Sequence, residues 1–456
     1  MEDSYRSTNP WWPLCLITIL PAFLGVLLSL IDPSQIKTVI FLLIFSSLVF
    51  VQPMLGVVSL AGLLHAGQAI RLLMGEEIAD PFFPIAFLVL FAAAINLLGR
   101  KRVDLEFHRE YVYLFLFLLI ALLSLVKVSD FDLYLEFLWR LTGSAIIFFL
   151  FAMTVHSLKM LNYICWALIL STLVMCITGL WSILFGGFGI FGDRLMSLVT
   201  DPNDYAINLA LTIPFIFYLF NIVKKKSAKL FLITTSILIV INIMYTYSRG
   251  GYIILIVIVF SIVYKFARIR KMITIFLFAA PLIFFALFLP EEAVKRMDVI
   301  DKIAIGDYSG YADPLIERYN LLIAGLNMVK TEPILGVGLG NFRAVSPSYN
   351  AELKRHLPAH NMYVEVCAEL GILGFLFFIL FTFSIFNKIR KLKTSSIINT
   401  YRYFFLRDCM LISFVGFFVA GLVRNAEYSM EFWIFLALGL SVTRLASLQP
   451  TSMSQK

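Results

Sequence analysis

The chain has 456 residues, of which 60% are hydrophobic and only 14% are charged. A typical soluble domain is about 45–50% apolar and about 25% charged, so the composition excludes an ordinary soluble enzyme, a disordered protein and a fibrous repeat. The net charge of +8 lies in short basic clusters between apolar runs, which is typical of a membrane protein and not of a nucleic-acid-binding protein. We therefore expect an all-α polytopic membrane protein.

The apolar runs predict about 12–14 transmembrane helices, because a helix needs about 20 mostly apolar residues to cross a bilayer. Glycine and proline within these runs are compatible with spanning helices, since neighbouring helices satisfy the freed backbone groups. The runs comprise residues 12–30, 36–51, 54–73, 82–98, 111–126, 137–155, 161–185, 205–222, 230–247, 252–266, 273–289, 362–386, 403–423 and 432–442.

The basic clusters predict the orientation of the chain. Each cluster is separated from the next by an even number of predicted spans, so all of them lie on one side, which the positive-inside rule assigns to the cytoplasm. We expect a multi-pass protein of the cytoplasmic (inner) membrane with both termini in the cytoplasm. The clusters lie at residues 99–102, 224–229, 265–271 and 388–393.

The connections left for the outer face are residues 185–204, the short link Ser248-Arg-Gly-Gly251 and a large extracytoplasmic loop at 290–361. Within that loop, Asp313-Pro314 precedes apolar residues at helical spacing, which predicts a helix that lies on the membrane surface or packs on the bundle. The active site is therefore expected on the extracytoplasmic side.

Two arginines stand at predicted outer ends of spans. Arg194 precedes the run Asp201-Pro-Asn-Asp204, which is typical of a turn and helix cap. Arg249 is followed by Gly250 and Gly251, and an arginine beside open backbone amides at a helix N-terminus is typical of an anion site. For both arginines, a side chain that snorkels to the lipid headgroups is the alternative interpretation.

His360 directly precedes a long apolar run on the predicted outer face. A helix N-terminus disfavours the imidazolium ion, so we expect a neutral imidazole that can accept a proton near pH 7. A capping or hydrogen-bonding histidine is the alternative. No grouping of His, Cys, Asp and Glu has metal-ligand spacing, so no metal site is predicted. Gly336-Val-Gly-Leu-Gly340 lacks the strand–turn–helix context of a nucleotide site, and we expect it to provide turns and close backbone approach.

The motifs resemble those of the O-antigen ligase and polysaccharide polymerase superfamily. His360-Asn361, followed after nine residues by Gly371-Ile-Leu-Gly374, resembles its H-N-x9-G-x-x-G signature, and Arg194-Leu-Met-Ser-Leu198 is similar to its R-x3-L element. The further pieces that resemble the family, in the family's order, are Asp201-Pro-Asn-Asp204, Ser248-Arg-Gly-Gly251 and Glu332-Pro-Ile-Leu-Gly-Val-Gly-Leu-Gly340.

The resemblance implies a metal-independent, cofactor-free membrane glycosyltransferase of the GT-C type. It would take a glycan from a polyprenyl (undecaprenyl) diphosphate to an acceptor hydroxyl on lipid A core (ligase) or on another lipid-linked repeat unit (polymerase, as in exopolysaccharide biosynthesis). By motif, Arg194 would hold the diphosphate and His360 would act as base. The second essential arginine would be Arg249 or Arg318, and spacing alone leaves both open. We favour Arg249 as the catalytic arginine for its anion-site geometry and keep Arg318 as a candidate.

The resemblance also divides the chain into regions. The N-terminal transmembrane helices occupy 1–185, a ligase-like catalytic region occupies 186–386 and includes the loop 290–361, and C-terminal helices with a cytoplasmic tail occupy 387–456. The expected partners are the lipid-linked glycan, a glycan or lipid acceptor and membrane lipids, but no nucleic acid. Substrate binding is assigned to four residues: Arg318, Asn361, Asn203 and Gly250.

A transporter is the competing class, because a lipid-linked oligosaccharide flippase or another multi-span carrier has a similar number of spans. Carriers place their substrate sites near the midplane of the membrane, between paired halves with broken helices. Here the polar motifs gather at one predicted face and a large loop lies outside the membrane, which favours the enzyme.

Overall fold

The computed structural model describes residues 55–64, 108–185, 190–191, 194–196, 201–266, 314–392 and 400–447. Within this part of the chain, eight helices are long and apolar enough to cross a membrane. The expectation of an all-α polytopic membrane protein is therefore confirmed. The runs predicted at 12–30, 36–51, 82–98 and 273–289 lie outside the described residues, as does the first part of the loop 290–361.

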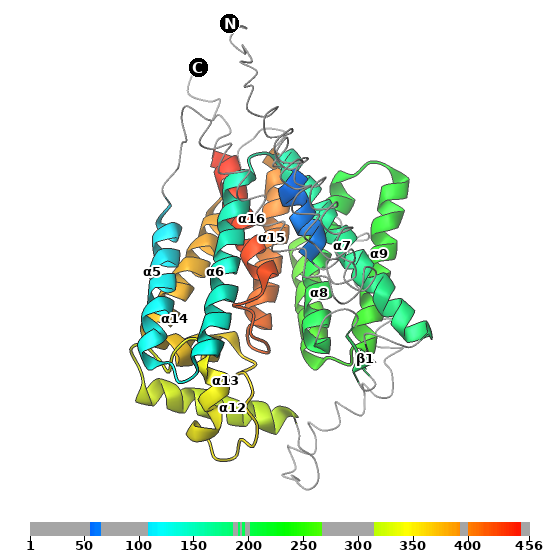
Figure 1. The fold of residues 1–456 in the computed structure, drawn as a ribbon. Helices are drawn as coiled ribbons and strands as arrows, with labels where there is room; N and C mark the ends of the chain where they lie inside the picture. The colour runs from blue at the N-terminus through cyan, green and yellow to red at the C-terminus, as the bar shows by residue number, and fades with distance from the viewer. Residues whose placement is uncertain are drawn as a thin grey trace, which may run out of the picture.

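The long helices stand side by side in a bundle (Figure 1). Helix α5 packs on α14, α6 packs on α16, and α8 packs on α15, so segments far apart in the chain are neighbours in space. The helices of the bundle are α5 (Arg109–Leu123), α6 (Phe131–Thr154), α7 (Leu158–Phe185), α8 (Pro202–Ile222), α9 (Lys226–Tyr245), the helix Arg249–Phe266, α14 (Met362–Lys391), α15 (Thr400–Ala420), α16 (Met430–Ser447) and the shorter helix Leu55–Leu64.

Aromatic side chains fill the centre of the bundle. The ring of Phe381 on α14 lies 5.2 Å from that of Phe148 on α6 and 5.7 Å from that of Trp433 on α16, measured between centroids. The Trp433 indole is fully buried, and its N–H donates to the carbonyl oxygen of Glu427 at 2.7 Å, so its one polar group is satisfied. The core thus fixes α14, which begins at the candidate site, against α6 and α16.

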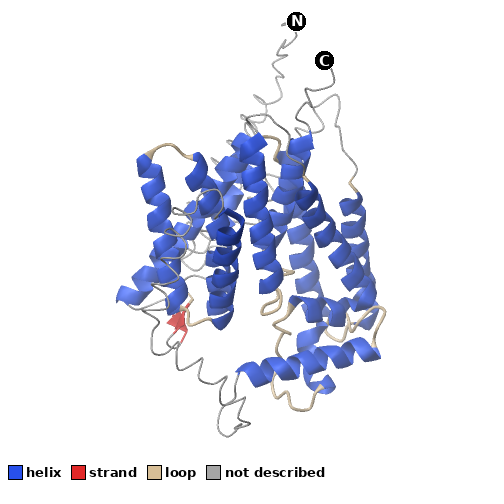
Figure 2. Ribbon diagram, turned by 180° about the vertical axis from the view of Figure 1, so that it is seen from behind, coloured by secondary structure: helices blue, strands red, loops and turns tan. Residues whose placement is uncertain are grey.

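Two helices lie across one end of the bundle, which we call the α12 end. They are α12 (Pro314–Thr331) and α13 (Asn341–Tyr349), and α12 runs across the axes of the long helices in both views (Figures 1 and 2). Leu321 and Met328 of α12 pack with Phe342 of α13 in a small hydrophobic cluster. The helix predicted after Asp313-Pro314 is confirmed, and it begins at Pro314.

The glycine-rich segment before α13 packs its backbone against α14. Gly336 has φ 68°, and a Cβ there would lie 2.4 Å from the carbonyl oxygen of Ala368, so only glycine fits. On α14, Gly371 has φ 64° and kinks the helix, and the amide of Ile372 donates to the carbonyl oxygen of Pro333 at 2.8 Å. The prediction of turns and close backbone approach is confirmed.

A short hairpin precedes α8 at the α12 end. Its strands β1 (Ile190–Phe191) and β2 (Arg194–Leu195) are antiparallel, and Phe191 pairs with Arg194. Strand β2 contacts α7 and α9. Helix α8 then begins at Pro202, and the Asp201 side chain caps it by accepting from the amides of Asn203 and Asp204. The predicted turn and cap are confirmed.

The opposite end of the bundle is basic. It holds the start of α9 at Lys226, the end of the helix Arg249–Phe266, which carries Lys265, and the end of α14 at Lys391 (Figure 1). Lys388 there donates to the fully buried carboxylate of Glu110 at 2.7 Å and ties α14 to α5. The described parts of three predicted basic clusters therefore share one end, as the even span counts require.

Candidate active site

Arg194 is held at the α12 end by two elements. Its Nε donates to the carbonyl oxygen of Thr246 at 3.0 Å, and its Nη2 donates to Asn203 Oδ1 at 2.9 Å. The Ser248 hydroxyl donates to the same Asn203 oxygen at 2.8 Å. Asn203 therefore joins the hairpin, the start of α8 and the turn after α9, and the half-buried Arg194 guanidinium is fixed beside that turn.

The turn after α9 presents Arg249. Thr246, Tyr247 and Ser248 form the turn, Tyr247 has φ 50°, and the next helix begins at Arg249. The expectation of open glycine amides is wrong for Gly251, because its amide donates to the Ser248 hydroxyl at 3.1 Å and so caps the helix internally.

The two glycines that follow Arg249, Gly250 and Gly251, allow close packing. A Cβ at Gly251 would lie 2.3 Å from that of Ala206 on α8, so this glycine permits close packing of the two helices. Gly250 is half-buried, and a Cβ there would lie 3.2 Å from a methyl carbon of Val423. Gly250 lies in the first turn of the helix Arg249–Phe266, whereas the sequence placed it in the link before that helix.

His360 stands directly before α14 in a left-handed backbone conformation, with φ 51°. Asn361 is the N-cap of α14, and its Oδ1 accepts from the amides of Tyr363 and Val364 at 3.1 and 3.2 Å. The amide of Met362 donates to the carbonyl oxygen of Gly421 at 2.8 Å. The His360 imidazole is half-buried and lies at the α12 end. The side-chain amide oxygen of Asn361 caps α14.

The surroundings of His360 lower its pKa below the ordinary value of 6.5. Burial is the main cause, the positive charge of Arg318 is the second, and Asp201 and Glu317 act in the opposite direction. The sequence predicted a neutral imidazole, and a lowered pKa agrees with that prediction. The predicted cause was the helix N-terminus, whereas burial and the charge of Arg318 lower the pKa here.

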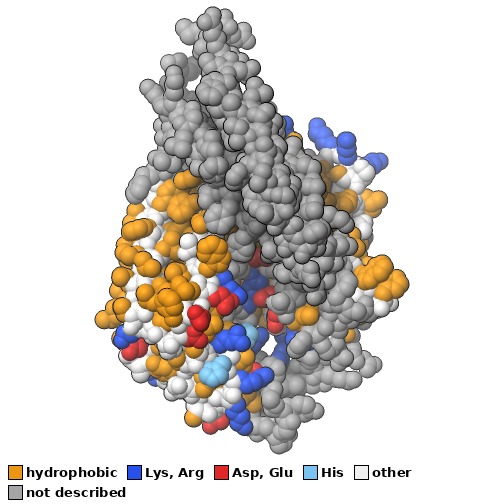
Figure 3. Space-filling model, viewed as in Figure 1, with side chains coloured by type: hydrophobic (Ala, Val, Ile, Leu, Met, Phe, Trp, Pro, Cys, Tyr) orange, Lys and Arg blue, Asp and Glu red, His pale blue; other side chains and the backbone are white. Residues whose placement is uncertain are grey.

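Arg318 connects His360 electrostatically with Arg249. It lies on α12, and its pKa is lowered first by burial and then by the positive charge of Arg249, whereas Asp201 and Asp204 raise it. Arg318 therefore lies within electrostatic reach of both His360 and Arg249. In Figure 3, acidic, basic and histidine side chains gather in a hollow above α12 and α13, while apolar side chains cover α5 and α6.

Arg424 belongs to the same cluster and was missed by sequence reasoning. It lies in the connection between α15 and α16 and is 5% exposed. Its Nη1 donates to Asn208 Oδ1 at 2.9 Å and lies 3.5 Å from the Asp204 carboxylate, and its Nη2 donates to the Ser429 hydroxyl at 3.0 Å. Its carbonyl oxygen accepts from the amide of Met362 at 3.1 Å, so Arg424 ties the start of α8 to the start of α14.

Three buried carboxyls beneath His360 were also missed. Glu365, Glu369 and Glu427 are each at most 2% exposed. Glu365 Oε2 accepts from the amide of Ala359, and Glu369 accepts from the amide of Phe342 and from the Tyr428 hydroxyl. Glu365 and Glu369 lie one turn apart within a predicted span, and ionisable residues inside a span are a signal that sequence reasoning could have used.

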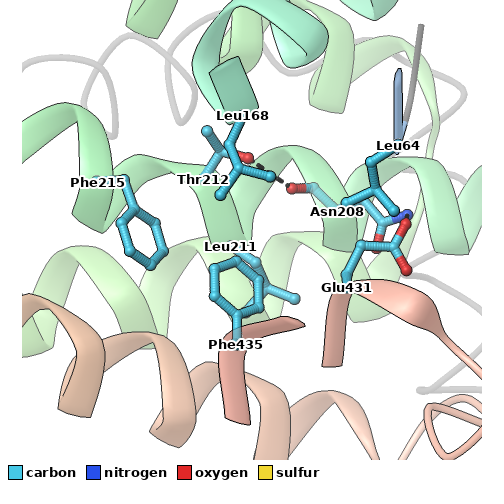
Figure 4. A pocket seen from close by; sticks show the side chains of 8 residues that line it. All are labelled: Leu64, Leu168, Asn208, Leu211, Thr212, Phe215, Glu431 and Phe435. Carbon is cyan, nitrogen blue, oxygen red and sulfur yellow. Dashed lines mark hydrogen bonds between the residues drawn. The ribbon is translucent and has the colours of Figure 1, made fainter. Parts of the chain in front are cut away.

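A small pocket of about 10 Å³ lies inside the bundle, next to the polar cluster (Figure 4). Its polar lining includes Glu431, whose carboxylate accepts from Asn208 Nδ2 at 3.2 Å, and Thr212, whose hydroxyl donates to the Asn208 carbonyl oxygen. Asn208 therefore separates this pocket from Arg424. The pocket is lined by Leu64, Leu168, Asn208, Leu211, Thr212, Phe215, Glu431 and Phe435.

Part of the chain that forms this site matches a known protein family. Residues 233–379 match the family model of the O-antigen ligase. The resemblance to the O-antigen ligase superfamily is thereby confirmed. The matched O-antigen ligase region contains Arg249, Arg318 and His360, whereas Arg194 and Arg424 lie outside it. No curated protein matches the chain.

The candidate site places positively charged arginine side chains beside the imidazole of His360. Arg318 lies within electrostatic reach of Arg249, Asp201 and His360. Arg194 joins them through Asn203 and the turn that carries Arg249. Chemically, such a site can bind a dianionic group through its guanidinium ions and accept a proton on the imidazole. Among the described residues, no group of three or more His, Cys, Asp or Glu is placed to hold a metal ion.

Proposed function

We propose that this protein transfers or polymerises a glycan, taking it from a polyprenyl diphosphate-linked donor to an acceptor hydroxyl at the outer face of the cytoplasmic membrane. The observation that carries the proposal is the gathering of Arg318, Arg249 and His360 at the α12 end, within the O-antigen ligase region. The match of residues 233–379 to the O-antigen ligase family model supports a lipid-linked glycan as the donor and a hydroxyl group as the acceptor.

In the proposed reaction, His360 takes the proton of the acceptor hydroxyl. The acceptor oxygen then forms a bond to the anomeric carbon of the donor sugar, and the bond from that carbon to the diphosphate oxygen breaks. The electron pair of the broken bond stays on the diphosphate, and the proton on His360 passes to solvent. A lowered imidazole pKa keeps the base neutral before reaction, which supports this role.

The arginines are assigned to the leaving group. Negative charge grows on the diphosphate in the transition state, so Arg194, Arg249 and Arg318 would stabilise that state more than the ground state. Arg318 is the second essential arginine that we favour, because it interacts with both His360 and Arg249. Guanidinium ions supply the positive charge, so the proposed reaction uses no metal ion. The basic residues at the opposite end of the bundle support an extracytoplasmic site.

The test is a transfer assay with purified protein in detergent and a lipid-linked donor. His360→Ala is expected to lower the rate by about 10²–10⁴-fold because the base is lost, and Arg194→Gln by about 10²–10³-fold because one donor to the diphosphate is lost. His356→Ala is the matched control. His356 is an exposed histidine four residues earlier whose Nδ1 lies 3.0 Å from the Ala344 carbonyl oxygen, so its loss is expected to leave the rate unchanged.

Two results would contradict the proposal. One is full transfer activity in folded His360→Ala. The other is movement of the lipid-linked glycan across vesicle membranes with no new glycosidic bond, which would support a flippase.

A further inference from the structure

The backbone at His360 is strained. Among the described residues, only Tyr247 and His360 are non-glycine residues with positive φ, and His360 has φ 51°. The left-handed conformation is unfavourable for a residue with a Cβ atom. Such a conformation persists where surrounding contacts hold it, and strained residues cluster at functional sites.

Contacts on both sides of His360 hold this conformation. On its C-terminal side, the amide of Met362 donates to the carbonyl oxygens of Gly421 and Arg424 at 2.8 and 3.1 Å. On its N-terminal side, the amide of Ala359 donates to the Glu365 carboxylate at 3.0 Å. The Glu365 contact is made by a side chain, and it reaches back over the first turn of α14 to the residue before the histidine.

A buried glutamate is an unfavourable hydrogen-bond acceptor for a single backbone amide, that of Ala359, because the carboxyl group must be desolvated. Glu365 is 2% exposed, lies within a membrane-spanning helix and interacts electrostatically with Glu369 and Glu427. Burying a carboxyl next to two others is unfavourable, and an apolar side chain would pack at lower cost. Metal binding does not account for the three carboxyls, since no metal-ligand grouping occurs in the part of the chain that the structure describes.

We propose that Glu365 is a positioning residue for glycan transfer, which fixes the left-handed backbone at His360 by accepting the Ala359 amide and so aims the imidazole at the acceptor. Because Glu365 and His360 are joined through one rigid helical turn, the ring is placed relative to α14 and not relative to a mobile loop. This inference rests on the proposed role of His360 as base.

The test compares Glu365→Gln with Glu365→Leu. Glutamine keeps an oxygen for the Ala359 amide. Its NH₂ group would face the nearby Asn425, which donates toward the Glu365 carboxyl and whose Oδ1 has no hydrogen-bond partner among the described residues. Rotation of the Asn425 amide would turn this Oδ1 toward the new NH₂ group as its acceptor. Glu365→Gln is therefore expected to keep near wild-type kcat. Leucine removes the acceptor, and a misplaced catalytic group costs about 10²-fold, so Glu365→Leu is expected to lose kcat by about that factor while the donor KM stays unchanged.

Glu110→Leu is the matched control. Glu110 is a fully buried glutamate that binds Lys388 of α14 at the opposite end of the bundle, so its replacement is expected to lower thermal stability but not kcat. If Glu365→Leu cannot be purified, Glu365→Asp keeps a carboxyl group but withdraws it from the Ala359 amide by one methylene group, and the same loss of kcat is expected.

The outcomes separate the two proposals. Full activity in His360→Ala overturns the proposed base and this inference with it. An inactive His360→Ala with a fully active Glu365→Leu or Glu365→Asp overturns only the positioning role. The positioning role is also overturned if Glu365→Gln is as impaired as Glu365→Leu, or if Glu110→Leu loses kcat to the same extent.

Discussion

At the scale of single residues, the imidazole of His360 combines two properties that a base needs. It is half-buried beside Arg318, which lowers its pKa, and it is attached to the start of a rigid helix by contacts on both sides. A base whose pKa lies below 6.5 is mostly neutral at pH 7 and is therefore ready to accept a proton.

The lowered pKa predicts the pH dependence of transfer. Because His360 must be neutral to act as base, the rate is expected to fall as the pH drops through its pKa, and the acid limb of kcat/KM is expected to have its midpoint below 6.5. Arg318→Gln removes a neighbouring positive charge and should raise that midpoint. Glu317→Gln removes a neighbouring negative charge and should lower it. The pH profiles of the three proteins check this, and shifts of equal sign in the two variants would contradict it.

The residues differ in how far the sequence could predict them. Arg194, Arg249 and His360 stand in recognisable motifs, and their placement at one end follows from counting spans between basic clusters. Arg424 stands in no motif, and its partner Asp204 lies 220 positions away in the chain, so only the folded backbone brings them together. The role of the Glu365 carboxylate likewise depends on the left-handed turn at His360, which no sequence pattern indicated.

At the scale of elements, the kink in α14 connects the site to the glycine-rich segment. At Gly371 the helix leaves regular geometry, and the amide of Ile372 bonds the carbonyl oxygen of Pro333. This contact holds the segment that joins α12, which carries Arg318, to α13. The placement of Gly371 ten residues after Asn361 thus has a physical reason in this chain, since the glycine lets α12 and α13 dock on the helix that begins after His360.

Gly371→Ala is expected to destabilise the protein by more than about 2 kcal/mol, because alanine disfavours φ 64° by about 1–2 kcal/mol and its Cβ would lie 2.2 Å from the Ile334 carbonyl oxygen. Thermal unfolding of the purified protein measures this. Gly62→Ala is the control, since its Cβ would meet only the Ala167 side chain, at 3.8 Å, and helix propensity favours alanine there by up to about 1 kcal/mol. Equal stability of the two variants would contradict the structural role of Gly371.

The starts of several elements could be predicted from local chemistry. The Asp201-Pro-Asn-Asp204 run caps α8, and Asp313-Pro314 precedes α12, as expected. The amide of Gly251 was expected to stay open, but it donates to the hydroxyl of Ser248, which directly precedes the helix. Local patterns therefore indicate where a helix begins more reliably than which of its amides stay open to a ligand.

At the scale of the whole molecule, the bundle separates charge along its length. One end holds Lys265, Lys388 and the start of α9, and the other holds the arginine, aspartate and histidine cluster beside α12. The separation suits a substrate with an apolar tail in the bilayer and a charged head at its surface. Composition and span counting predicted this layout, but which helices are neighbours depends on packing such as α5 on α14.

The most direct test of the central claim is equilibrium binding of a polyprenyl diphosphate to the purified protein in lipid nanodiscs. Each of Arg194→Gln, Arg249→Gln and Arg318→Gln removes a charge-assisted hydrogen bond of about 1.5–3 kcal/mol and is expected to weaken binding by about 10- to 100-fold. Arg140→Gln, on the exposed surface of α6, is the control and should bind as the wild type does. His360→Ala should also bind normally, although its transfer rate is expected to fall by about 10²–10⁴-fold. Unchanged binding in the three site variants would contradict the claim that these arginines form one diphosphate site.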